Sequence, residues 1–240
     1  MAKLPSYAHG SLTPLLGDTI GENLRRTVER FGSREALVVR SQGYRATYTQ
    51  LWEAVSEIAR AFIALGLERG DRIALFSPNR FEWVVSQFAA ARAGLILTNV
   101  NPAYKTSELE YVLTQSGAKA LLLAKSFRQN DYVQMLAEIR PRLTELREVF
   151  VFDTDWETLR AWSLRATDAD LAAREQALQF DDAINIQYTS GTTGTTGAPK
   201  RRPRHRPPFV SSRRAKPRQV GGALPGRGRS RFGWWKSAPQ

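Results

Sequence analysis

The sequence predicts an α/β fold in which helices flank a largely parallel sheet. Two short apolar runs, "IALF" at residues 73–76 and "LLLA" at residues 121–124, are typical of strands that are buried on both faces. Helix-like segments of about ten or more residues alternate with such runs up to residue 188. A length of 240 residues is enough for one large domain or two small ones.

The first expected elements are a helix, a strand pair and a second helix. Apolar residues recur at helical intervals from Thr19, and this helix is expected to stop at Gly32. Residues 35–48 predict two short strands around a turn. Thr49 is then the expected N-cap of a long amphipathic helix, with Gly66 at its C-terminal end.

The next elements alternate strand and helix. Residues 71–76 predict a strand, residues 81–94 a helix that ends in glycine, and residues 95–100 another buried strand. Ser107 and Glu110 have the three-residue spacing of a capping box, which predicts a helix from this point.

The remaining elements continue the same alternation. Residues 118–124 and 147–153 predict strands on either side of a helix at Tyr132–Ile139. A polar helix at Asp168–Leu178 then leads into a last strand at residues 183–188.

Composition excludes several classes of site. The chain has no cysteine, which excludes disulfides, cysteine-ligated zinc and a thiol nucleophile. Its two histidines, His9 and His205, argue against a histidine metal site or a Ser-His-Asp triad, and we expect no metal site in the chain itself. We interpret the acidic residues 153–157 as a solvated loop. The N-terminus lacks the apolar core of a signal peptide, and no run could cross a bilayer, so we expect a cytoplasmic protein.

The net charge of +12 is confined to one end of the chain. Residues 1–200 hold equal numbers of basic and acidic side chains, whereas residues 201–240 hold 12 Lys and Arg and no acid. Residues 201–240 also carry six of the twelve prolines and show no apolar period, so we predict that they are disordered.

The segment after the last predicted strand has the chemistry of a polyphosphate site. Its glycines allow the backbone N–H groups to converge on an anion, its hydroxyls can donate to phosphate oxygens, and Lys200 adds a positive charge. Parallel sheets bind ligands beyond the carboxyl ends of their strands. An isolated string of this kind can also be a plain flexible loop. The candidate binding residues are Thr189, Ser190, Gly191, Thr192, Thr193, Gly194 and Lys200.

The same segment, "YTSGTTG…PK", closely resembles the phosphate-binding motif of the adenylate-forming (AMP-binding) superfamily. Three upstream strings resemble that superfamily in order: "ATYTQL", "NVNPAY" and "SELEYVL". They are similar to the acyl-CoA synthetase, or fatty-acid–CoA ligase, branch. The resemblance runs from about Leu15 to Lys200 and implies the front half of a large N-terminal domain.

The resemblance implies a two-step ligase. A carboxylic acid, which the branch suggests is fatty or otherwise apolar, would react with Mg-ATP to form an acyl-adenylate and pyrophosphate. Coenzyme A would then displace AMP. The matched residues Thr189–Gly194 and Lys200 would hold the β- and γ-phosphates.

The sequence departs from the family pattern at two places. Residues 195–197 repeat Thr-Thr-Gly, so the loop is three residues longer than the pattern, which is about 10 Å of extended chain. After Lys200 no later family motif is recognisable. We therefore expect a partial AMP-binding domain at residues 15–200 that is inactive alone, between an N-terminal arm at residues 1–14 and the basic tail.

The basic tail has two interpretations. Its Arg, Pro, Ala and Gly content is typical of GC-rich codons read in the wrong frame. We therefore expect a frameshifted product whose correctly translated part ends near Lys200. The alternative is a non-catalytic protein that binds nucleotide, or nucleic acid through the tail. Such a tail could also bind polyanions without specificity.

Overall fold

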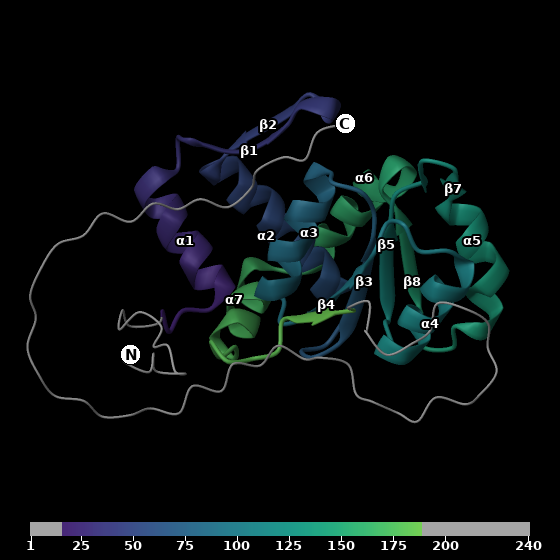
Figure 1. Cartoon of the computed structure of the whole chain (residues 1–240). Helices are drawn as coiled ribbons and strands as arrows, with labels where there is room; N and C mark the ends of the chain where they lie inside the picture. Colours follow the sequence, from purple (N-terminus) through teal and green to yellow (C-terminus); the bar gives the residue numbers. More distant parts are fainter. Residues whose placement is uncertain (1–15, 189–240) are drawn as a thin grey trace, which may run out of the picture.

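In a computed structural model, which describes residues 16–188, helices cover both faces of a five-stranded sheet (Figure 1). Every neighbouring pair in this sheet is parallel, as the short apolar runs predicted. The strand order is β8-β5-β3-β4-β9. The strands are β3 (Arg72–Phe76), β4 (Ile96–Val100), β5 (Ala120–Leu123), β8 (Glu148–Val151) and β9 (Asn185–Gln187).

The helices form two layers because alternate residues of each strand point to opposite faces. Ile73 and Leu75 pack in one core cluster, whereas Ala74 and Phe76 pack in the other. The first cluster draws on α1 (Ile20–Phe31), α2 (Tyr48–Ala64), α3 (Phe81–Arg92), α6 (Phe152–Trp162) and α7 (Asp168–Gln176). The second draws on α4 (Thr106–Ser116) and α5 (Tyr132–Ile139).

Short elements complete the described chain. Two antiparallel hairpins lie outside the main sheet, and three 3-10 turns extend or connect longer elements. The hairpins are β1 (Glu35–Val39) with β2 (Tyr44–Thr47) and β6 (Ser126–Phe127) with β7 (Asn130–Asp131), and the 3-10 turns are η1 (Arg40–Gln42), η2 (Arg140–Arg142) and η3 (Ser163–Arg165).

The start of α2 differs from the prediction. Its N-cap is Thr47, and Thr49 lies inside the helix. The Thr47 hydroxyl accepts a hydrogen bond from the Gln50 N–H at 3.3 Å, and the Gln50 side chain accepts one from the Thr47 N–H at 2.8 Å. This reciprocal pair needs an acceptor three residues after the cap, and Thr49 has Trp52 there.

The predicted capping box at Ser107 and Glu110 is also wrong by two residues. α4 begins at Thr106, and the Lys105 N–H donates to the Glu108 carboxylate at 2.9 Å. Glu110 points elsewhere and forms an ion pair with Arg142. The acid that accepts a hydrogen bond at the start of α4 is therefore Glu108, three residues after the actual N-cap, Lys105.

The acidic residues 153–157 are not a loop but the first turns of α6. Asp155 accepts a hydrogen bond from the Val151 N–H at 2.8 Å, just before the helix begins. Acidic side chains are favourable at a helix N-terminus because its free N–H groups carry partial positive charge. No helix within residues 16–188 is long and apolar enough to cross a membrane.

Candidate functional site at the carboxyl edge of the sheet

The five parallel strands end along one side of the sheet, which we call the carboxyl edge. β9 ends at Gln187, beside β4, and Tyr188 is the last described residue. The chain therefore reaches this edge where the sequence placed the start of the phosphate loop. The predicted binding residues lie outside the described residues: Thr189, Ser190, Gly191, Thr192, Thr193, Gly194 and Lys200.

Tyr188 is anchored where the chain leaves the sheet. Its hydroxyl lies 3.5 Å from the Val112 carbonyl oxygen of α4, to which it donates, and its ring meets Tyr111 edge-to-face at 6.3 Å between centroids. Burial, with smaller contributions from Tyr111 and Tyr104, raises the pKa of Tyr188 to about 12. The phenol is thus neutral near pH 7, and it serves as a hydrogen-bonded anchor rather than a proton carrier.

The turn after β4 lies at the same edge. The Asn101 side chain accepts a hydrogen bond from the Ala103 N–H at 2.9 Å, and the Asn101 carbonyl accepts one from the Tyr104 N–H at 3.0 Å. Asn101 and Tyr104 therefore have a structural role in this turn.

Tyr132 ties this turn to the core. Its hydroxyl donates to the Pro102 carbonyl at 2.6 Å, and its ring stacks on Phe76 with 3.7 Å between centroids. Burial raises the pKa of Tyr132 to about 12. A buried tyrosine, Tyr132, and a half-buried one, Tyr188, thus brace the chain at the ends of β4 and β9.

A pair of amides at this edge was missed by sequence reasoning. Asn99 and Gln187 are register partners on β4 and β9, and the Asn99 side-chain N–H donates to the Gln187 side-chain oxygen at 3.3 Å. The buried side-chain oxygen of Asn99 has no hydrogen-bond partner among the described residues. Polar residues at the ends of two apolar strands were the available signal, but strand order was needed to bring them together. This oxygen is therefore an unused hydrogen-bond acceptor among the described residues.

The charged groups near the ends of β3 and β8 are structural. Arg80 contacts Glu82 at 2.8 Å and Asp153 at 2.7 Å, and Glu82 is only 3% exposed. Burial would raise the pKa of Asp153, but hydrogen bonds from Arg80 and the Lys125 N–H lower it below its usual value. These carboxylates are already paired. Across residues 16–188, no group of three or more His, Cys, Asp or Glu side chains is placed to hold a metal ion.

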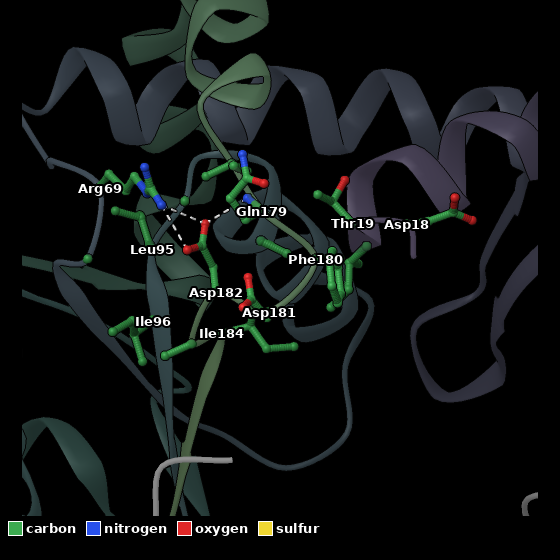
Figure 2. Close-up of a pocket in the computed structure, with 16 residues that line it drawn as sticks. Asp18, Thr19, Arg69, Leu95, Ile96, Gln179, Phe180, Asp181, Asp182 and Ile184 are labelled. Atoms are coloured by element: carbon green, nitrogen blue, oxygen red, sulfur yellow. Dashed lines mark hydrogen bonds and ion pairs between the residues drawn. The ribbon is translucent and has the colours of Figure 1, made fainter. Parts of the chain in front are cut away.

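A separate hollow of about 390 Å³ lies at the opposite edge, near the amino ends of β4 and β9. In it, Arg69 makes two contacts of 2.8 and 2.9 Å with Asp182, as Figure 2 shows. Asp18 and Asp181 also line the hollow. Because its arginine is neutralised and its other charges are negative, this hollow is unsuited to phosphate.

Comparisons with known proteins agree with the fold. A family described as AMP-binding enzyme matches residues 24–200. Human mitochondrial medium-chain acyl-CoA ligase ACSF2 is 39% identical over 211 residues, which cover 79% of this chain and 34% of that protein. The zebrafish (Danio rerio) enzyme of the same name is 37% identical over 210 residues, with the same coverage.

Two solved structures from Mycobacterium tuberculosis are similar in shape. A fatty acyl CoA synthetase superimposes with a TM-score of 0.62 at 28% identity, over 72% of this chain and 32% of that one. The N-terminal domain of FACL13 superimposes with a TM-score of 0.61 at 27% identity, over 72% of this chain and 42% of that one. The chain thus spans about a third of the length of the curated relatives it matches.

Proposed function

The chain belongs to the AMP-binding enzyme family, and from this premise we propose that it derives from an acyl-CoA synthetase. Such a ligase activates a carboxylic acid with ATP and transfers the acyl group to coenzyme A. The observation that carries the proposal is the exit of the chain from β9 at the carboxyl edge, next to the sequence Thr189–Gly194.

We assign the nucleotide's terminal phosphates to Thr189, Ser190, Gly191, Thr192, Thr193, Gly194 and Lys200. Their amides, hydroxyls and ammonium would stabilise negative charge as pyrophosphate leaves. Magnesium would supply further positive charge to the phosphates. Residues 16–188 offer no cluster of acids for it, so we assign it no protein ligand there.

The acid is proposed to be fatty or otherwise apolar. The relatives are named medium-chain acyl-CoA ligases, and one structural neighbour is named a fatty acyl CoA synthetase. The length of the acyl group would be determined by competition among carboxylic acids of different length. A cytoplasmic location also stays a prediction, since the human relative is named as mitochondrial.

We propose that the 240-residue chain completes neither half-reaction alone. Residues 201–240 contain no recognisable later motif of the family, and the chain covers only about a third of its relatives. Pyrophosphate exchange with purified chain, Mg-ATP and decanoate measures the first half-reaction directly. We expect the rate of pyrophosphate exchange to be no greater with decanoate than without it. Robust decanoate-dependent ATP formation would contradict the proposed inactivity.

The extra Thr195-Thr196-Gly197 gives a sharper test of the loop. Deleting residues 195–197 restores the family spacing between Gly194 and Lys200, which should bring the lysine nearer to the phosphates. We expect the deletion to tighten Mg-ATP binding in calorimetry, and Lys200→Ala in the shortened chain to reverse the gain. Equal affinity for Mg-ATP in the unmodified chain, the deletion variant and the deletion variant with Lys200→Ala would show that Lys200 does not contact the phosphates.

We retain the partition into an arm at residues 1–14, a partial AMP-binding domain at residues 15–200 and a tail at residues 201–240. A shifted reading frame accounts for the tail's abrupt change to arginine and proline. The coding DNA tests this: a neighbouring frame downstream of Lys200 should encode later family motifs. Their absence from every frame would reject the frameshift.

A further inference from the structure

β9 leaves one side of the main sheet open within the described residues. The strand pairs with β4 on one side, and no described strand pairs with its other side (Figure 1). The Leu97 N–H of β4 donates to the Ile184 carbonyl at 3.0 Å, so the peptide groups of Ile184 and Ile186 face β4. Because peptide groups alternate along a strand, those of Asn185 and Gln187 point to the open side.

This edge lacks the features that commonly protect edge strands. Residues 183–188, "AINIQY", contain no charge and no proline, and the β4–β9 register runs without a bulge. Natural edges are often shielded by lysine, proline or bulges, because free N–H and C=O groups recruit another strand. Among residues 16–188, the one protective feature of this edge is that β9 is only three residues long.

The side chains of this edge are self-complementary. Ile184, Ile186 and Tyr188 share the face that carries α4 and α5, since they are spaced two apart. Ile184 is 40% exposed, although Ile186 beside it is buried. If a second β9 ran antiparallel about a two-fold axis at Ile186, Ile184 would lie opposite the partner's Tyr188. Aromatic and β-branched residues are favourable cross-strand pairs.

The backbone fits the same arrangement. In this register Asn185 lies opposite the partner's Gln187, and the outward peptide groups of both residues would exchange N–H···O bonds. On the other face, the Asn185 amide would meet the partner's Gln187 amide. Since neither residue is charged, no pair of like charges would lie opposite each other at these two positions.

We propose that the free edge of β9 is an interaction surface for β9 of a second copy of this chain. Other segments of this chain are poorer candidates for the position. Residues 1–15 contain two prolines, whereas residues 201–240 contain six prolines and 12 positive charges without a sustained apolar alternation. The contact is small, so the dimer is weak and concentration-dependent. It requires no ligase activity and stands apart from the proposed function.

Disulfide trapping tests the register, because the chain has no native cysteine. Ile186→Cys places two thiols opposite each other at the two-fold axis, and mild oxidation should give a covalent dimer on a non-reducing gel. Ile184→Cys is the matched control, since its thiol would lie opposite the partner's Tyr188, about 13 Å from its own copy. Equal cross-linking of both variants, or of neither, would overturn the arrangement.

Sedimentation of the full chain tests the surface itself over about 1–100 µM protein. We expect the dissociation constant of the dimer to rise at least tenfold in Ile184→Lys, because lysine replaces the apolar contact of Ile184 with the partner's Tyr188. Val133→Lys on α5 is the matched control, with 41% exposure against 40% for Ile184. Circular dichroism checks that both variants fold. A monomer throughout this range, or equal effects of the two substitutions, would reject the proposal.

Discussion

At the scale of single residues, Arg92 joins the helices of one face. Its side chain is 4% exposed, its Nε contacts Glu175 of α7 at 2.5 Å, and its Nη1 donates to Ser56 of α2 at 2.5 Å. The guanidinium also lies 3.5 Å from the centroid of the Trp52 ring. A buried cation is tolerated here because an acid, a hydroxyl and an aromatic face surround it.

We expect Arg92→Ala to lower the free energy of unfolding by about 3 kcal/mol, because it leaves Glu175 without its partner and opens a cavity. Urea titration followed by tryptophan fluorescence measures the loss. Arg25→Ala is the control, since Arg25 pairs with Glu29 at an exposed position and should cost no more than about 1 kcal/mol. Equal costs would show that burial of Arg92 adds nothing.

Tyr132 and Tyr188 predict a loss of stability at high pH. Their pKa values are about 12 in the folded chain, against about 10 when unfolded. The unfolded state therefore loses these protons first. The stabilisation of the folded state by these two protonated phenols is complete below pH 10, and it disappears as the pH rises towards 12.

Absorbance at 295 nm follows this ionisation directly. We expect part of the tyrosine signal of the folded chain to appear only near pH 12, and Tyr132→Phe to reduce that late part. The same chain in urea should titrate in one step near pH 10. A folded chain that also titrates in one step near pH 10 would contradict the burial of both phenols.

Asn99 shows why part of the site could not be predicted from single residues. The glycine and threonine motif after β9 was visible because its residues are consecutive in the sequence. The pairing of Asn99 with Gln187 depends instead on β9 entering the sheet next to β4. Neither strand's composition specifies its neighbour, so the amide pair emerges only from the topology.

At the scale of elements, apolar periodicity identified most helices and strands but not their ends. The α/β alternation and the strands of the main sheet were predicted, because buried positions repeat along each segment. α6 was missed where its acidic first turns resembled a loop. The starts of α2 and α4 were misplaced by two residues, because several hydroxyl and acidic residues compete for a cap.

The cap of α2 gives a paired test. We expect Thr47→Ala to destabilise the chain by about 1 kcal/mol, because the Gln50 N–H loses its acceptor. Thr49→Ala should have a much smaller effect, since Thr49 lies inside the helix and alanine has a higher helix propensity. Thermal or urea unfolding compares the two variants, and a larger effect at Thr49 would restore the original prediction.

At the scale of the whole molecule, charge is divided unevenly along the chain. The excess of positive charge falls entirely in residues 201–240, whereas the first 200 residues are balanced. Any attraction to polyanions should therefore belong to the tail and should depend on salt, because phosphate contacts release counterions.

We expect the full chain to bind a fluorescent single-stranded oligonucleotide at about 50 mM salt and to lose at least tenfold in affinity by about 200 mM. A chain that ends at Lys200 should not bind measurably, and oligonucleotides of scrambled sequence should bind equally. Tight sequence-selective binding would instead favour the nucleic-acid-binding alternative. Retention of binding after removal of the tail would assign it to the folded part.

The strand order also has a consequence for synthesis on the ribosome. β3, β4, β5 and β8 all emerge before β9, whose contacts with β4 span more than 80 residues of sequence. Four strands can thus associate while the fifth is still being translated, and the short β9 joins a preformed edge. The proposed nucleotide loop directly follows β9, which is the last and shortest strand of the main sheet. Local detachment of these three residues from β4 would therefore free the start of the loop while the rest of the domain stayed folded.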